Sequence, residues 1–87
     1  MKKLIVSGFI ENGSLHIRMN DSLIIDGSGD FEMNLEPRTT HMLTWFAEGT
    51  PKSNFRITVS SPAESSFQMH KALGKSGKDT GIHYIES

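Results

Sequence analysis

Four histidines give this chain its widest choice of chemistry, because imidazole binds zinc, copper and nickel and exchanges protons near neutral pH. No two of them stand at the short spacing of a ligand pair such as H-x-H. A metal site would have to be assembled by the fold from His16, His70 and His83. Isolated histidines on strand faces are mostly surface residues, so we expect no metal and no other cofactor.

Oxygen-bearing side chains alternate with glycine in the segment 26–30, DGSGD, as at the start of an EF-hand calcium loop. Such a loop ends in a bidentate glutamate, and Pro37 stands at that place here. The flanking helices are missing too, so we interpret 26–30 as a polar hairpin loop. Asn20 and Asp21 lie nearby in sequence and leave a calcium site of another kind open.

The segment 74–81, GKSGKDTG, contains the glycines, lysines and serine of a phosphate-binding loop but not their spacing. The first glycine of that motif would fall at Met69 or Ala72. We therefore interpret 74–81 as a mobile hairpin loop. No G-x-S-x-G segment marks a nucleophile, and the carboxylates fall mostly at strand ends and turns. The sequence predicts a protein that is not an enzyme.

Aromatic side chains on a sheet face can stack on sugars or bases. Alternation turns Trp45 towards the core, whereas Tyr84 is expected to be exposed. If the protein binds a carbohydrate, its candidate contacts are Arg18, Asp26, Asp30 and Tyr84.

The composition predicts one globular domain, residues 1–87, with 36% hydrophobic and 22% charged residues. A net charge of −1 offers no basic surface for nucleic acid or for an anionic membrane. No segment approaches the length of a membrane span. The chain has no cysteine, which excludes disulfides and thiolate metal sites and favours a reducing compartment. With no recognisable signal peptide, we expect a cytoplasmic protein.

Apolar and polar residues alternate along most of the chain, which is typical of half-buried strands. Turn residues such as Asn12-Gly13, Pro37 and Gly49 separate the alternating segments. The predicted strands are 3–11, 14–20, 22–26, 30–36, 40–48, 54–61, 66–73 and 81–86. Short strands at this spacing predict an all-β, antiparallel Greek-key β-sandwich with no helix longer than one turn.

The pair Asn12-Gly13 predicts a two-residue hairpin between the first two strands, because both residues accept a positive φ. In that hairpin Ile10 faces Leu15. Alternation then assigns Ile5 and Phe9 to the outer face of the first strand. The core-facing residues of the two strands are Leu4, Val6, Ile10, Leu15, Ile17 and Met19.

The segment from Leu35 to Leu43 resembles the E–F corner of fibronectin type III and related immunoglobulin-like domains, whose pattern is Leu-x-Pro-x-Thr-x-Tyr. Pro37 and Thr39 match, and His41 takes the place of the tyrosine. The resemblance implies an immunoglobulin-like sandwich in which 40–48 is strand F, 54–61 is strand G and the Asn-Gly hairpin joins strands A and B. It also implies that His41 points inward and bonds backbone across the corner. Two further strands follow strand G, where such domains usually end.

These observations favour a small protein-interaction or assembly module, with a carbohydrate-binding module as the alternative. Edge strands can accept a strand from a partner, and contiguous exposed apolar residues mark interfaces. We expect a homodimer whose interface draws on the apolar residues left outside the core, Ile5, Phe9, Met42 and Phe46. The rival expectation is that the last two strands cover one of these faces within the monomer. A flat apolar face would favour protein binding, and exposed aromatic residues in a groove would favour sugar binding.

Overall fold

The computed structural model describes residues 2–86, which form eight strands and one turn of 3₁₀ helix. The elements are β1 (Lys2–Ile10), β2 (Gly13–Met19), β3 (Ser22–Asp26), β4 (Gly29–Leu35), β5 (Thr40–Gly49), β6 (Asn54–Ser61), η1 (Ala63–Ser65), β7 (Phe67–Ala72) and β8 (Lys78–Glu86). The predicted strands are confirmed to within about one residue except at the start of β8. There the expected loop at 78–80 is part of the strand.

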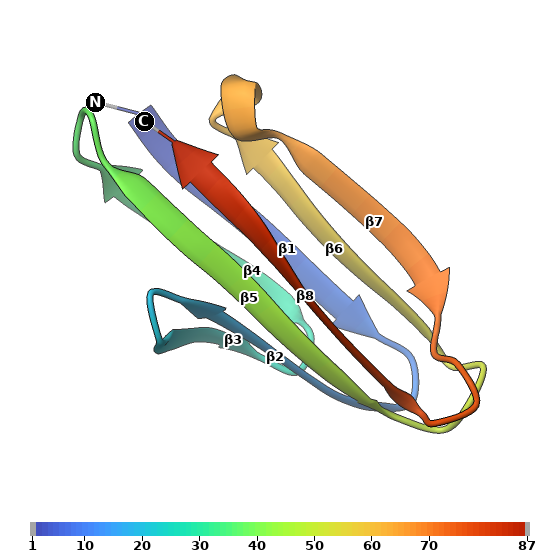
Figure 1. The fold of residues 1–87 in the computed structure, drawn as a ribbon. Helices are drawn as coiled ribbons and strands as arrows, with labels where there is room; N and C mark the ends of the chain where they lie inside the picture. The colour runs from blue at the N-terminus through green and yellow to red at the C-terminus, as the bar shows by residue number, and fades with distance from the viewer. Residues whose placement is uncertain (1, 87) are drawn as a thin grey trace.

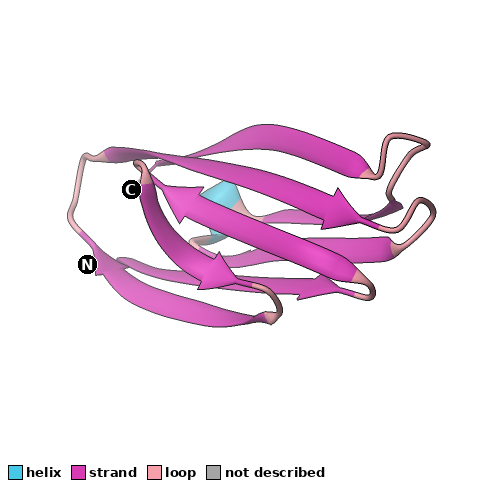
Figure 2. Cartoon of the chain, turned by 90° about the horizontal axis from the view of Figure 1, so that it is seen from below, coloured by secondary structure: helices cyan, strands magenta, loops and turns pink. Residues whose placement is uncertain are grey.

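The strands build two antiparallel sheets of four, stacked as two layers (Figures 1 and 2). Sheet A has the order β4-β1-β6-β7, and sheet B has the order β3-β2-β5-β8. The predicted all-β antiparallel sandwich is confirmed. Among residues 2–86, no helix is long and apolar enough to cross a membrane.

Alternating side chains from both sheets fill the space between the layers. The most deeply buried include Leu4 and Val6 of β1, Leu15 and Ile17 of β2, and Phe55 of β6. The inner faces expected from alternation are therefore confirmed for these strands. Phe67, from the edge strand β7, closes the open side of the sandwich, with its ring centroid 5.7 Å from that of Trp45 and 4.6 Å from that of His83.

The predicted hairpin between β1 and β2 is wrong, because these strands lie in different sheets. β1 pairs with β4 and β6, and β2 pairs with β3 and β5. The turn residues bond across the end of the sandwich: the Glu11 amide donates to the Asn54 carbonyl (2.9 Å) and the Asn12 amide to Ser53 Oγ (2.8 Å). Gly13 is needed because its φ is +144° and a Cβ there would overlap the Glu48 carbonyl oxygen. Asn-Gly here turns the chain from one sheet to the other.

The turn with the two positive φ angles of a type I′ hairpin lies instead at Asn20 (φ 50°) and Asp21 (φ 70°), between β2 and β3. Asn20 also fixes this turn to β5. Its side-chain oxygen accepts from the Met42 amide (2.9 Å), and its backbone amide donates to the Met42 carbonyl (3.0 Å). The segment 26–30, expected to be a hairpin loop, instead crosses between the sheets from β3 to β4.

The corner before β5 differs from the one that the immunoglobulin-like resemblance implied. Thr39 Oγ1 bonds the backbone by donating to the Glu36 carbonyl (2.7 Å). His41 is half-buried and bonds two side chains, with Nδ1 at 2.8 Å from Asn20 Nδ2 and Nε2 at 3.1 Å from Thr39 Oγ1. The expected backbone bond from His41 is therefore wrong, and threonine makes it instead.

The order of the strands also departs from the expected assignment. β5 and β6, which the resemblance assigns to strands F and G, lie in different sheets, just as β1 and β2 do. Only the β2–β3 and β6–β7 connections stay within one sheet, and the other five cross. This order matches a circularly permuted jelly roll, the eight-stranded architecture built from two Greek keys.

Candidate protein-binding face

The outer face of sheet A is predominantly polar. Its paired residues include Ile5 opposite Glu32 and Arg56 opposite His70. Phe9 is its exposed large apolar side chain, and the guanidinium carbon of Arg56 lies 5.6 Å from the centroid of that ring. A cation over the ring partly masks it from water. This face therefore offers little continuous apolar surface.

The outer face of sheet B, which we call face B, carries more exposed apolar side chains. It carries four of the five large hydrophobic residues that are exposed among residues 2–86: Leu23 (45% exposed), Phe46 (39%), Ile82 (56%) and Tyr84 (59%). Half-buried Met42 pairs with Tyr84 across β5 and β8. The apolar residues thus span sheet B from β3 at one edge to β8 at the other.

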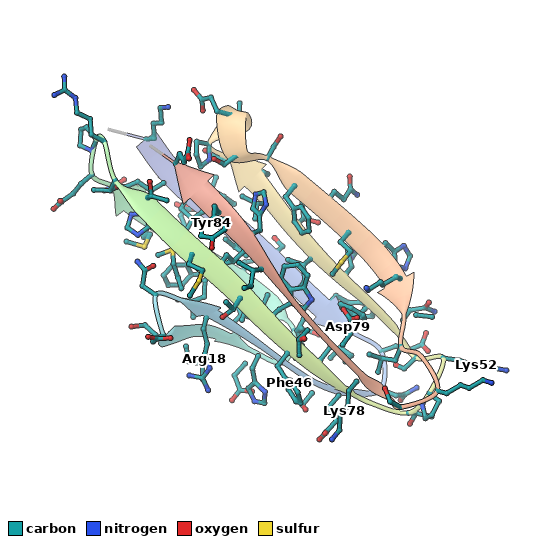
Figure 3. All side chains as sticks on the ribbon, in the orientation of Figure 1. Arg18, Phe46, Lys52, Lys78, Asp79 and Tyr84 are labelled. Carbon is teal, nitrogen blue, oxygen red and sulfur yellow. The ribbon has the colours of Figure 1, made fainter. Side chains whose placement is uncertain are left out.

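The strand register places polar residues among these apolar ones. Arg18 pairs with Leu23 on one side and with Thr44 on the other, and Thr44 in turn pairs with Ile82. Figure 3 shows Arg18, Phe46 and Tyr84 on three strands of this sheet. Face B therefore mixes separate apolar side chains with Arg18, His16 and threonine hydroxyls, and carries charged residues such as Glu48 and Lys78 towards one end.

The four residues predicted to form an interface do not come together. Met42 and Phe46 belong to face B, whereas Ile5 and Phe9 lie on the outer face of sheet A. The expectation that β7 and β8 cover a face is wrong, because each strand extends the edge of one sheet. β8 contributes Ile82 and Tyr84 to face B, and these are the two most exposed large hydrophobic residues of that face.

Three of the four candidate sugar contacts share face B. Arg18 and Tyr84 are exposed there, and Asp26 contacts His16, with Oδ1 3.1 Å from Nε2. Asp30 lies on β4 in sheet A, opposite Ser7. The DGSGD segment thus separates its two aspartates, and Ser28 Oγ accepts from the Ile10 amide (3.1 Å). This use of Ser28 explains the segment as a structural crossing.

The structure gives no support to a metal centre in the part of the chain that it describes. No three histidine, aspartate or glutamate side chains of residues 2–86 approach closely enough to hold a metal ion. His16 lies on face B, His70 on the outer face of β7 and His83 inside the open edge against Phe67. The trio suggested by the sequence is therefore dispersed.

A shallow depression of about 330 Å³ lies on the β6–β7 hairpin. It is lined by Thr58, Val59, Ser60, Ser66, Phe67 and Gln68. None of these side chains titrates near neutral pH, so the depression lacks the acid and base that hydrolytic chemistry requires.

Sequence reasoning missed Leu23 and Ile82 as members of face B. In the run Leu23-Ile24-Ile25 the alternation is hidden, and a register shift opposite Ile17/Arg18 decides which residue points outward. Ile82 is two residues from Tyr84 and therefore lies on the same face of β8. The expected exposure of Tyr84 could thus have identified Ile82 as exposed too. No protein-family model, no curated protein and no solved structure matches this chain.

Proposed function

We propose that the protein is a non-catalytic protein-interaction module that binds through face B. The observation that carries the proposal is the contrast between the two outer faces. One has its single exposed phenylalanine under an arginine, and the other bears Leu23, Phe46, Ile82 and Tyr84. Extended apolar patches on small domains commonly mark binding surfaces. We place this activity in a reducing compartment such as the cytoplasm, in keeping with the lack of cysteine.

The composition of face B suits a protein partner. Aromatic residues, methionine and arginine are enriched at the centre of protein interfaces, and face B presents Phe46, Tyr84, Met42 and Arg18. Charged pairs lie towards the rim, with Lys78 Nζ 3.5 Å from Glu48 Oε2. Protein interfaces usually have a polar rim. The proposal does not depend on an immunoglobulin-like relationship, which rests only on the corner motif.

A carbohydrate remains the alternative partner, because Tyr84 and Phe46 are exposed aromatic rings on the face that also holds Arg18. Sugars stack on such rings. The depression lined by residues 58–60 and 66–68, however, lies on the other sheet. Affinity electrophoresis through polysaccharide gels tests this alternative, since Tyr84→Ala should then abolish any retardation.

The proposed function is tested by introducing a charged side chain on face B. Phe46→Glu places a carboxylate between His16 and Thr80, the cross-strand neighbours of Phe46 on face B. It should abolish partner binding while leaving the fold intact, because the side chain lies outside the core. Thr58→Glu puts the same charge on the outer face of sheet A and is the matched control. The readout is the size of the native complex, followed by gel filtration of an extract from the cells that make the protein.

The proposal predicts that the unmodified protein and Thr58→Glu elute in a complex with another protein or with a second copy. Phe46→Glu should lose this complex and elute as a smaller species. Equal elution of Phe46→Glu and Thr58→Glu would show that face B does not mediate the interaction.

A further inference from the structure

The strand β8 has an unpaired edge. It pairs with β5 on one side and is the outermost strand of sheet B. Met42 directs its amide and carbonyl towards Asn20, away from β8. Its cross-strand partner Tyr84 must therefore direct its own amide and carbonyl away from β5, because opposite residues of an antiparallel pair either both bond each other or both bond outward. Alternation extends this outward direction to Ile82 and Thr80.

Both ends of this edge are already satisfied. Ser65 Oγ, from η1, accepts from the Glu86 amide (3.1 Å) and donates to the Glu86 carbonyl (3.4 Å). At the other end, the Lys78 amide donates to Ser76 Oγ (3.3 Å). The open part of the edge is therefore Thr80, Ile82 and Tyr84. Each of these residues offers one N–H and one C=O with no strand beside them among residues 2–86.

We propose that two copies of the protein pair through this edge. The β8 strands run antiparallel about a two-fold axis at Ile82, and the two B sheets join into one sheet of eight strands. Thr80 then lies opposite Tyr84 of the second copy, and Ile82 lies opposite itself. Three residues from each chain share six hydrogen bonds, and all the open groups of the edge are used. A symmetric pair of identical edges is the simplest closed assembly.

The side-chain charges favour a second copy of the protein as the partner that pairs with the β8 edge. In the register centred on Ile82, Lys78 lies opposite Glu86 of the second copy, and symmetry repeats the pair at the other end. All four side chains point to face B, and Lys78, whose Nζ lies 3.5 Å from Oε2 of Glu48 in its own chain, can also bind Glu86 across the junction. Shifting the pairing by two residues in either direction removes this match and leaves part of the open edge unused.

The pairing deepens the proposed function and rests on it, because it would set two copies of face B side by side. It would also shelter the exposed side chains of Ile82 and Tyr84, which flank the junction. Unprotected edge strands invite uncontrolled association, and closed pairing of two edges limits it.

The test removes the backbone N–H of Ile82, the residue that lies beside the two-fold axis in each copy. Ile82→Pro deletes an N–H that points outward, so the monomer loses no internal hydrogen bond, and the preceding Gly81 has no Cβ to clash with the proline ring. Ile82→Thr removes the same apolar side chain but keeps the amide. His70→Pro makes the equivalent change on the free edge of β7, because Leu73 bonds towards β6 and alternation turns the amide of His70 outward. Sedimentation velocity over a range of concentrations follows the mass.

We expect the unmodified protein, Ile82→Thr and His70→Pro to form dimers at high micromolar concentration and Ile82→Pro to stay monomeric. Amide hydrogen exchange supplies a readout that needs no variant. Exchange at Thr80, Ile82 and Tyr84 should slow as concentration rises, while Gln68 and His70 do not change. A monomer at every concentration, or a dimer of Ile82→Pro, overturns the inference.

Charge reversal tests the register. Lys78→Glu and Glu86→Lys should each weaken the dimer by at least about fivefold, because both ion pairs of the dimer are replaced by pairs of like charge. The double variant should restore it, and failure to restore it would contradict the Ile82 register. If Phe46→Glu splits the dimer and Ile82→Pro does not, the copies meet through face B. The edge pairing is then wrong while the proposed binding face stands.

Discussion

Replacing Trp45 with alanine is expected to lower the free energy of unfolding by about 3–5 kcal/mol, as large-to-small changes in cores do. Trp45 is only 8% exposed, and its Nε1 donates to Asp79 Oδ2 (3.3 Å). The ring contacts Phe67 at the open side of the sandwich and lies against Gly81, its partner on β8. Alanine would leave a cavity between the sheets and remove one of the two partners of Asp79, whose Oδ1 still lies 3.0 Å from Lys71 Nζ. Urea denaturation followed by far-ultraviolet circular dichroism measures the loss.

The contact with Gly81 gives this prediction a second test. A Cβ on Gly81 would overlap the six-membered ring of Trp45, so Gly81→Ala should cost about 1–3 kcal/mol in the unmodified protein. In the Trp45→Ala background the space is free, and Gly81→Ala should be neutral or slightly stabilising. Additive effects in this double-mutant cycle, or a loss below about 1 kcal/mol for Trp45→Ala, would contradict the inward placement of the indole.

Gly49→Ala is expected to cost about 3 kcal/mol, because the added Cβ would overlap the Asn12 carbonyl oxygen. The obstacle is backbone, which cannot rotate away as a side chain can. This contact exists because the turn after β1 crosses the end of β5 on its way to the other sheet. If β1 and β2 formed a hairpin within one sheet, this contact between Gly49 and the Asn12 carbonyl would not be expected.

Gly29→Ala is the matched control for Gly49→Ala. No atom lies within 4 Å of a Cβ built on Gly29, and its φ is not positive. It should leave stability unchanged or raise it by about 0.5 kcal/mol. Urea denaturation compares the two variants, and equal stability would argue against the crossing of β1 and β2.

The sequence predicted the strands well because alternation is a local property. Whether Ile17 points inward depends on its own strand, and the inner and outer faces of β1 and β2 were right even though their pairing was wrong. Pairing is set by contacts between distant segments, such as β1 with β6, and a turn like Asn12-Gly13 serves a hairpin or a crossing between sheets equally well. The local pattern therefore could not distinguish the two topologies.

The same limit applies to the candidate site. Alternation correctly turned Phe46 outward and left Tyr84 exposed. It could not tell that Phe9 stands on the opposite side of the molecule from Phe46, because that depends on which sheet each strand joins. The open edge of β8 could not be predicted from the sequence either, because it follows from the strand order and from the hydrogen bonds of Ser65.

The most direct test of face B as the binding surface is light-activated crosslinking in the cells that make the protein. A benzophenone amino acid replaces Phe46 on face B or, as the control, Thr58 on the outer face of sheet A. If face B is the binding surface, position 46 gives discrete crosslinked products, either with another protein or at the mass of two copies, and position 58 gives none. Products from position 58 alone, or none from position 46, would contradict this assignment of face B.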